Sequence, residues 1–293
     1  MLARSGFTAI PVLLSTRNHG IAPVKYPSID NYNYVITLLK IDNQKILLDA
    51  SNKFLQFGHL KTSCYNGLAR VVDTSYSSIN LSADSLKESS QTTVFISNEG
   101  KTLEGFFTSA FGSIESYHLK QESSKNKQQD FLNEIKKSYS MPVEISDMFL
   151  DSINSTEDPV SVRYTMKFIL GDEDIIYFNP LLSEAIKENP FRSEDRLYPV
   201  EMPYCSDETY VLNMEIPNGY IIDELPKSAR VNLNENDGFF EYIINKTNTN
   251  IQLRCRLKFN KANFIPDDYQ TLRDFYSYVV KKEAEQIVFK KAK

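Results

Sequence analysis

The clearest constraint on the fold is the alternating segment 250–259, NIQLRCRLKF. In an extended strand, successive side chains point to opposite faces of the sheet. Charged or amide side chains would therefore occupy one face of this segment. The residues of the other, apolar face are Ile251, Leu253, Cys255, Leu257 and Phe259. This alternation predicts an antiparallel strand with one face on a core and one face in water.

The rest of the C-terminal third continues this pattern, and we predict a β-domain over residues 201–293. A closing helix is predicted at 266–286, because Pro266 followed by two aspartates suits a helix N-terminus. Apolar residues then recur at helical spacing. The strands predicted in this part are 209–216, 228–233, 238–245 and 250–259, with turns at Asn218-Gly219 and Asn236-Asp237-Gly238.

A second β-rich unit is predicted over residues 85–200. It begins with a hairpin at 91–113 that turns at Asn98-Glu99-Gly100. A helix is predicted at 124–139, capped by Ser123 or Ser124. The further elements predicted here are strands at 143–150, 159–170 and 174–180 and a short helix at PLLSEAIKE, residues 180–188.

The N-terminal residues 1–58 predict a partial α/β piece. It consists of a helix end before Gly6, a strand at 8–15 and a hairpin at 32–49 that turns at Asp42-Asn43. The Ser-rich residues 59–84 predict a linker. The fold class expected for the whole chain is α+β, in which the α/β remnant precedes two mainly antiparallel, β-sandwich-like units with a few helices.

Composition excludes several classes of function. The 293 residues carry a net charge of −5 without a long basic patch, so nucleic acid is not an expected partner. Three separated cysteines and three scattered histidines predict neither a disulfide framework nor a metal site, and we expect no cofactor. No apolar run is long enough to cross a membrane. The apolar start lacks the pattern of a signal peptide.

Two N-terminal segments, LARSGFTAIPVLLSTR and YNYVITLLKIDNQKILLDAS, resemble the second half of a transglutaminase-like, papain-fold core. In that family a Cys opens a helix, a His starts the next strand, and an Asp ends the strand after it. Asp49 matches the family Asp, and Tyr34 occupies the His position. A one-residue shift would place Asn33 there instead. Neither side chain can act as the general base, and the family Cys lies upstream of the matching segment.

Later segments resemble the C-terminal β-domain of large Bacteroidetes proteins that contain a transglutaminase-like core. The resemblance rests on 175–226, IIYFNPLLSEAIKENPFRSEDRLYPVEMPYCSDETYVLNMEIPNGYIIDELP, and on the closing 259–291. It implies that this chain is the C-terminal portion of such a multidomain protein. It also implies a periplasmic or cell-envelope location, although the chain has no signal peptide of its own. The family's C-terminal domain brings no assigned activity.

Several local clusters have a functional and a structural interpretation. Cys64 with His59 and Asp49 has the residue types of a replacement triad, but a buried structural cysteine is the commoner case. Cys205 and Cys255 lie in one predicted domain, and the sequence leaves open whether they pair.

The segment 192–196, RSEDR, fits a ligand clamp or a surface ion network, and we favour the network. The aromatic pairs Phe106-Phe107 and Phe239-Phe240 suit either a sugar- or peptide-binding platform or core packing, and packing is favoured.

The main functional hypothesis is a non-catalytic, envelope-associated binding or scaffold module whose partner is a peptide, a glycan or an envelope protein. The alternative is a truncated part of a transglutaminase-like cysteine hydrolase or acyltransferase whose nucleophile lies upstream. A third hypothesis is that residues 1–58 associate with a separate N-terminal half, because an incomplete sheet exposes an unpaired edge and apolar surface.

Overall fold

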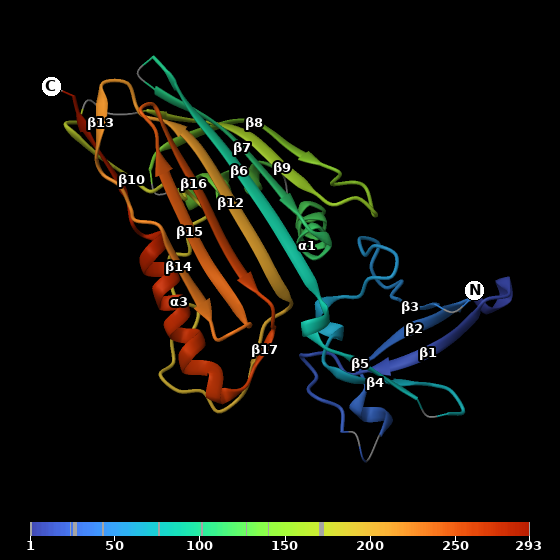
Figure 1. The fold of residues 1–293 in the computed structure, drawn as a ribbon. Helices are drawn as coiled ribbons and strands as arrows, with labels where there is room; N and C mark the ends of the chain where they lie inside the picture. Colours follow the sequence, from blue (N-terminus) through green and yellow to red (C-terminus); the bar gives the residue numbers. More distant parts are fainter. Residues whose placement is uncertain are drawn as a thin grey trace.

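The computed structural model describes residues 2–23, 25, 28–42, 44–75, 77–100, 102–126, 128–139, 141–169 and 173–292. Within these residues the protein is mainly β, with three α-helices and several sheets (Figure 1). A small sheet at the N-terminal end and a large curled sheet lie beside each other, and the chain passes from one to the other at the start of β6 (Lys87–Glu99).

The small sheet has five antiparallel strands in the order β3-β2-β1-β4-β5. We refer to residues 2–81, which carry it, as the first unit. The strands are β1 (Thr8–Leu14), β2 (Tyr34–Ile41), β3 (Gln44–Leu48), β4 (Gly67–Val71) and β5 (Ser78–Leu81). A small core of its own includes Val12, Ile36 and Cys64.

Residues 59–84, predicted as a linker, instead contribute β4 and β5 to this sheet, with Val12 of β1 opposite Val71 of β4. The expected α/β character is also absent from the described part of the first unit. Its helical turns are short 3-10 segments such as Leu2–Ser5, and its strands are antiparallel. The turn between β2 and β3 was predicted at Asp42-Asn43. Asp42 has a positive φ of 52°, which suits a tight turn, and Asn43 lies outside the described residues.

The large sheet has eight strands in the order β14-β15-β16-β12-β6-β7-β9-β8. It runs through both predicted units, so the division into 85–200 and 201–293 does not divide the sheet. Strand β12 pairs with β6 in parallel, and the other neighbours are antiparallel. The remaining strands of this sheet are β7 (Thr102–Phe111), β8 (Val143–Asp151), β9 (Ser161–Ile169), β12 (Cys205–Glu215), β14 (Ala229–Leu233), β15 (Gly238–Lys246) and β16 (Asn250–Phe259).

The predicted alternation of 250–259 is confirmed, because its five apolar side chains are buried in the main core. The helix α3 (Tyr269–Glu283) packs its buried Leu272, Phe275 and Val279 into the same core. A three-stranded sheet closes one end of this core, in the order β10-β18-β13. Its strands are β10 (Ile175–Phe178), β18 (Ile287–Lys291) and β13 (Tyr220–Glu224), and a two-stranded sheet joins β11 (Val200–Glu201) to β17 (Asn263–Phe264).

The single helix predicted at 124–139 is instead two helices, α1 (Ser113–Ser123) and α2 (Gln128–Ser138). Ser124, predicted to start a helix, is the C-cap of α1. The buried positions of α1 include Ser116 and Lys120, so this helix has no continuous apolar stripe. Its N-terminus is capped from β6, because the Glu88 carboxylate accepts hydrogen bonds from the backbone N–H groups of Ile114 and Glu115.

The helix predicted at 180–188 is a series of turns. The Asn179 side chain accepts a hydrogen bond from the Leu181 backbone N–H, and Leu182 has a positive φ of 56°. A left-handed residue at this point ends any right-handed helix.

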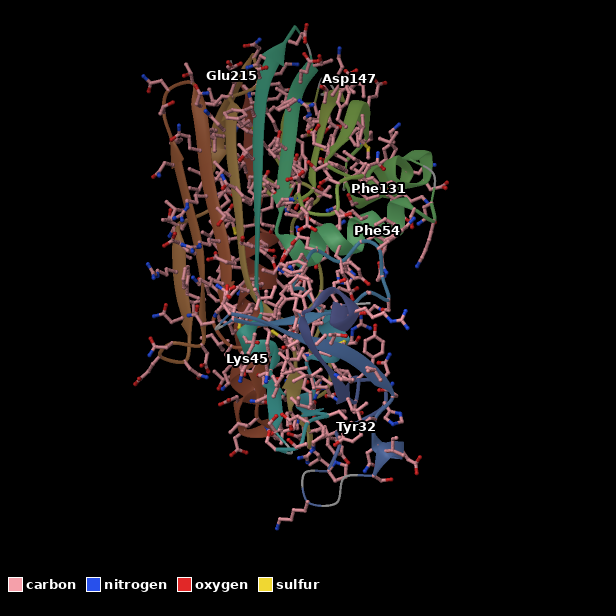
Figure 2. The ribbon with its side chains drawn as sticks, turned by 90° about the vertical axis from the view of Figure 1, so that its right-hand side faces the viewer. Tyr32, Lys45, Phe54, Phe131, Asp147 and Glu215 are labelled. Carbon is pink, nitrogen blue, oxygen red and sulfur yellow. The ribbon has the colours of Figure 1, made fainter. Side chains whose placement is uncertain are left out.

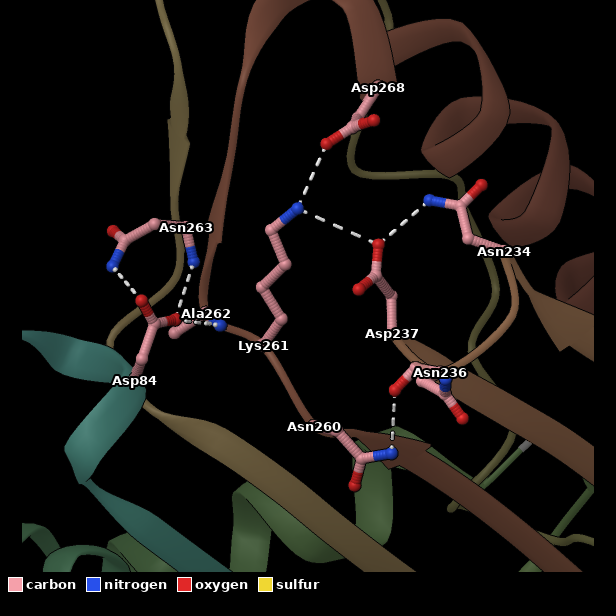
Figure 3. Close-up of polar contacts among 9 residues, drawn as sticks. All are labelled: Asp84, Asn234, Asn236, Asp237, Asn260, Lys261, Ala262, Asn263 and Asp268. Atoms are coloured by element: carbon pink, nitrogen blue, oxygen red, sulfur yellow. Dashed lines mark hydrogen bonds and ion pairs between the residues drawn. The ribbon is translucent and has the colours of Figure 1, made fainter.

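Asp84 lies between the first unit and β6 and binds the segment that follows β16 (Figure 3). It lies in a 3-10 turn before β6, and its Oδ1 accepts hydrogen bonds from the backbone N–H groups of Ala262 (2.6 Å) and Asn263 (3.1 Å). Its Oδ2 accepts another from the Asn263 side chain. In the same region, Lys261 forms ion pairs with Asp237 and Asp268, which ties the β14–β15 turn to the start of α3.

The Asp84 contacts predict a pH-dependent stabilisation. Burial opposes the charge of this carboxyl, but the hydrogen bonds from Asn263 and Ala262 outweigh burial and lower its pKa. An acid whose pKa is lowered on folding stabilises the fold at pH values above its usual pKa. This stabilisation is lost as the pH falls through the lowered pKa. We expect Asp84→Ala to lower the free energy of unfolding by about 1 kcal/mol at neutral pH, measured by urea denaturation.

Asp195→Ala is the matched control, because Asp195 is exposed in a loop. If both variants lost the same free energy of unfolding at neutral pH, the hydrogen bonds of Asp84 would not stabilise the fold.

Candidate functional site

The ends of β2 and β3 bring Tyr34 and Asp49 together. These are the two residues that the sequence resemblance places in the His and Asp positions. The Tyr34 hydroxyl donates a hydrogen bond of 2.8 Å to Asp49 Oδ2. Asp49 follows the last residue of β3, and its Oδ1 accepts a hydrogen bond from the Ser51 backbone N–H. The carboxylate is therefore held on one side by its own turn and on the other by the tyrosine.

Lys61 and Ser51 complete a cluster that we call the Tyr34 cluster: Tyr34, Asp49, Ser51 and Lys61. The Lys61 ammonium donates to the Tyr34 hydroxyl at 3.0 Å and to Ser51 Oγ at 3.2 Å, and it also lies over the Tyr34 ring. Partial burial alone would lower the pKa of Lys61, but the hydrogen bond to Tyr34 and the charge of Asp49 raise it. The cluster thus balances one cation against one carboxylate.

Asn33, the alternative for the His position, has a different role. Its side chain binds Thr16, accepting from the backbone N–H and donating to the hydroxyl. Tyr34, one residue later in β2, is the side chain that faces Asp49.

The residues of the suggested replacement triad do not form one. His59 is exposed, and in the described part of the chain its imidazole forms no hydrogen bond with Cys64 or Asp49. Cys64 is only 1% exposed, in the core of the first unit. Burial, followed by the negative charge of Asp49, raises the pKa of the Cys64 thiol to about 11. The thiol is therefore protonated near neutral pH and is a poor nucleophile.

The loop after β3 connects the Tyr34 cluster to the large sheet. Asn52 donates to the Tyr117 hydroxyl of α1, and Gln56 donates to the Glu157 carbonyl. Figure 2 shows Phe54, from this loop, on the side of the first unit that lies next to the helices. The loop that carries Ser51 therefore also contacts α1 and the segment between β8 and β9.

The other predicted clusters lie apart from the Tyr34 cluster. Cys205 and Cys255 are both buried and free, and no disulfide joins them. In the segment 192–196, Arg192 forms an exposed ion pair with Glu188, which fits the surface network. Each predicted aromatic pair has one buried ring and one on the opposite face of its strand. Phe107 and Phe240 are buried, whereas Phe106 and Phe239 face outward.

Sequence analysis missed a cavity on the core side of the large sheet. It has a volume of about 70 Å³, and its lining includes Glu184, Glu208, Cys255 and Glu283. Glu283 of α3 is 5% exposed and accepts hydrogen bonds from the Ile186 backbone N–H and the Cys255 thiol. Burial raises the pKa of Glu283 to about 7, and the neighbouring Glu208 and Glu184 contribute further.

The described residues contain no group of three His, Cys, Asp or Glu side chains that could hold a metal ion. Among the described helices, none is both long and apolar enough to cross a membrane.

Comparison with known proteins gives two matches. Residues 174–289, from β10 to β18, match the family model described as a domain of unknown function with solved-structure structure, DUF3858. A crystal structure from Parabacteroides distasonis ATCC 8503, described as a "putative protease", aligns with 98% of this chain at 12% identity and a TM-score of 0.48. The chain spans 41% of that protein's length. No curated protein matches the sequence.

The raised pKa of Glu283 predicts that this residue favours the folded state more at acidic pH than at neutral pH. An acid whose pKa is raised on folding binds more protons in the native state, so its favourable contribution is complete below its usual value near 4.5 and is lost as the pH rises to about 7. The free energy of unfolding of the wild type should fall as the pH rises from about 5 to about 8. In Glu283→Gln this fall should be smaller, and the difference between the two falls should be about 2–3 kcal/mol. Urea denaturation at several pH values measures this slope.

Glu224→Gln is the control, since Glu224 is exposed on β13. A wild-type slope retained in Glu283→Gln would contradict this assignment.

The Tyr34 cluster predicts a second measurable effect. Tyr34→Phe keeps the ring but removes the hydroxyl that binds Asp49 and Lys61. Because these groups are partly exposed, water replaces part of the lost bonding, and we expect a destabilisation of about 1 kcal/mol. Urea denaturation measures it, with Tyr32→Phe on the preceding turn as control. No difference between the two variants would rule out a stabilising role for the hydroxyl.

Proposed function

We propose that this chain is a non-catalytic binding or scaffold module of the bacterial envelope, derived from a transglutaminase-like protein. The observation that carries the proposal is the hydrogen bond from Tyr34 to Asp49. In a Cys-His-Asp arrangement, this acid would orient an imidazole that takes a proton from the thiol. Here its partner is a phenol, which donates its hydroxyl proton to the carboxylate and has no ring nitrogen to accept a proton from a thiol.

The contacts around Tyr34 support a structural role for the cluster. Lys61 donates to the same hydroxyl and to Ser51, so the tyrosine is held between a cation and an acid. Such a network stabilises the ends of β2 and β3 and the loop that packs against α1. Cys64 supports the proposal further, because its thiol is buried and its pKa is raised.

The alternative is that the protein belongs to a transglutaminase-like cysteine hydrolase or acyltransferase whose nucleophile lies upstream. One observation favours it: adjacent strands still place Tyr34 and Asp49 in contact, as an acid and its base would be placed. In both proposals the first unit is the part that would associate with an N-terminal half of such a core. Phe7 and Val35 leave apolar surface exposed on this unit.

A turnover assay tests the non-catalytic proposal. The protein is incubated with a glutamine-containing peptide and with a fluorogenic peptide mixture, and released ammonia and fluorescence are followed. We expect no turnover above that of Cys64→Ser. In parallel, iodoacetamide at about pH 8 should label no cysteine of the native protein and all three after unfolding in guanidinium, because the three thiols are buried.

Turnover that both iodoacetamide and Cys64→Ser abolish would overturn the proposal. Rapid labelling of Cys64 in the native protein would contradict the burial argument.

A further inference from the structure

We infer that the outer face of the large sheet binds a neutral, linear glycan across a row of uncharged side chains centred on Phe95 and Phe106. This inference rests on the proposed function as a binding module and names its ligand class. The row comes from the strand register, which places one residue of each strand directly opposite the next. We call it the neutral row. Its members, from β15 to β8, are Asn245, Gln252, Asn213, Phe95, Phe106, Thr165 and Ser146.

The neutral row lies on the face away from the core. The residues before and after Phe95, Val94 and Ile96, are buried in the core, as are Leu212 and Met214 around Asn213. Phe95 is 53% exposed and Phe106 is 47% exposed, although each is large and apolar. Two half-exposed phenylalanines directly opposite each other on central strands form an apolar platform in the middle of the sheet.

Charged residues border the neutral row on both sides. On one side of the row, two positions along their strands from the row members, lie Arg254 of β16 and Arg163 of β9. In the other direction are Glu215 of β12 and the facing pair Glu104 and Lys167. The row itself carries no charge across seven strands. A ligand that matches it should therefore be neutral, because a charged ligand would meet no opposite charge within the row.

The chemistry of the row fits a sugar chain better than a peptide. Phenylalanine rings offer apolar faces to the C–H faces of sugar rings, and amides and hydroxyls can both donate to and accept from sugar hydroxyls. An extended peptide usually binds at the edge of a sheet, where backbone groups are free. Phe95 and Phe106 lie on strands that are paired on both sides.

The length of the row sets the size of the ligand. Neighbouring strands are about 4.8 Å apart, so a row across seven strands is about 29 Å long. A linear oligosaccharide of several sugar units would cover it, running across the strands.

Affinity gel electrophoresis tests this inference. Native gels contain hydroxyethylcellulose, glucomannan, dextran or soluble starch as neutral probes, and alginate as an anionic probe. We expect at least one neutral polysaccharide to retard the wild-type protein. The double variant Phe95→Ala/Phe106→Ala should lose at least about tenfold in affinity. Gln252→Glu, which adds a charge to the row, should weaken the same binding.

Phe149→Ala is the matched control. Phe149 is 54% exposed and lies outside the row, against Arg163. It should bind like the wild type. All substituted positions are exposed, and urea denaturation checks that each variant folds.

Three results would overturn the glycan site: no retardation by any neutral probe, retardation kept by the double variant, or stronger retardation by alginate than by the neutral probes. These results are separate from the turnover assay. A protein that shows neither turnover nor glycan binding remains a non-catalytic module with another partner, whereas thiol-dependent turnover overturns the proposed function itself.

Discussion

The parallel pairing of β12 with β6 is the contact on which the rest of the structure depends. It places residues 205–214 beside 87–96 and so joins two groups of four strands into one sheet. Leu212 and Val94, opposite each other in this register, are both fully buried in the shared core. Without the pairing, each group would expose an unpaired strand edge and half of the core. The turn that holds Asp84 comes directly before β6, so the pairing also positions this carboxylate beside Ala262 and Asn263.

The parts of the fold that sequence predicts well are those stabilised by local pattern. The alternation of 250–259 and the Pro266 start of the last helix are local signals, and both elements occur where expected. Helix α1 was missed because its stabilising partners are distant in sequence: Glu88 caps its start, and Lys120 donates to the Asp158 carbonyl. Strands β4 and β5 were missed because both are short and the segment around β5 is rich in serine, which is typical of loops. Their strand structure depends on pairing with β1 and with each other.

The same distinction applies to the candidate site. The hairpin and the family resemblance together identified Tyr34 and Asp49, which lie at the start of β2 and just after the adjacent β3. Lys61 and Ser51 carried no such signal, because they come from the loop between β3 and β4 and reach Tyr34 only after that loop folds back. The neutral row was also invisible in the sequence. Its members come from seven strands, and only the register of the whole sheet brings them into line.

The β6–β12 pairing also affects how the chain is made. β6 leaves the ribosome roughly a hundred residues before β12, which at typical synthesis rates is on the order of ten seconds. During this interval β6 can pair with β7 on one side only, and its other edge remains open. Pairing strands so distant in sequence is also slow, because the entropy cost of closing a long loop comes before any stabilising contact between the strands has formed. The newly made protein therefore passes through a stage in which one long, partly apolar strand edge is exposed and needs protection from other chains.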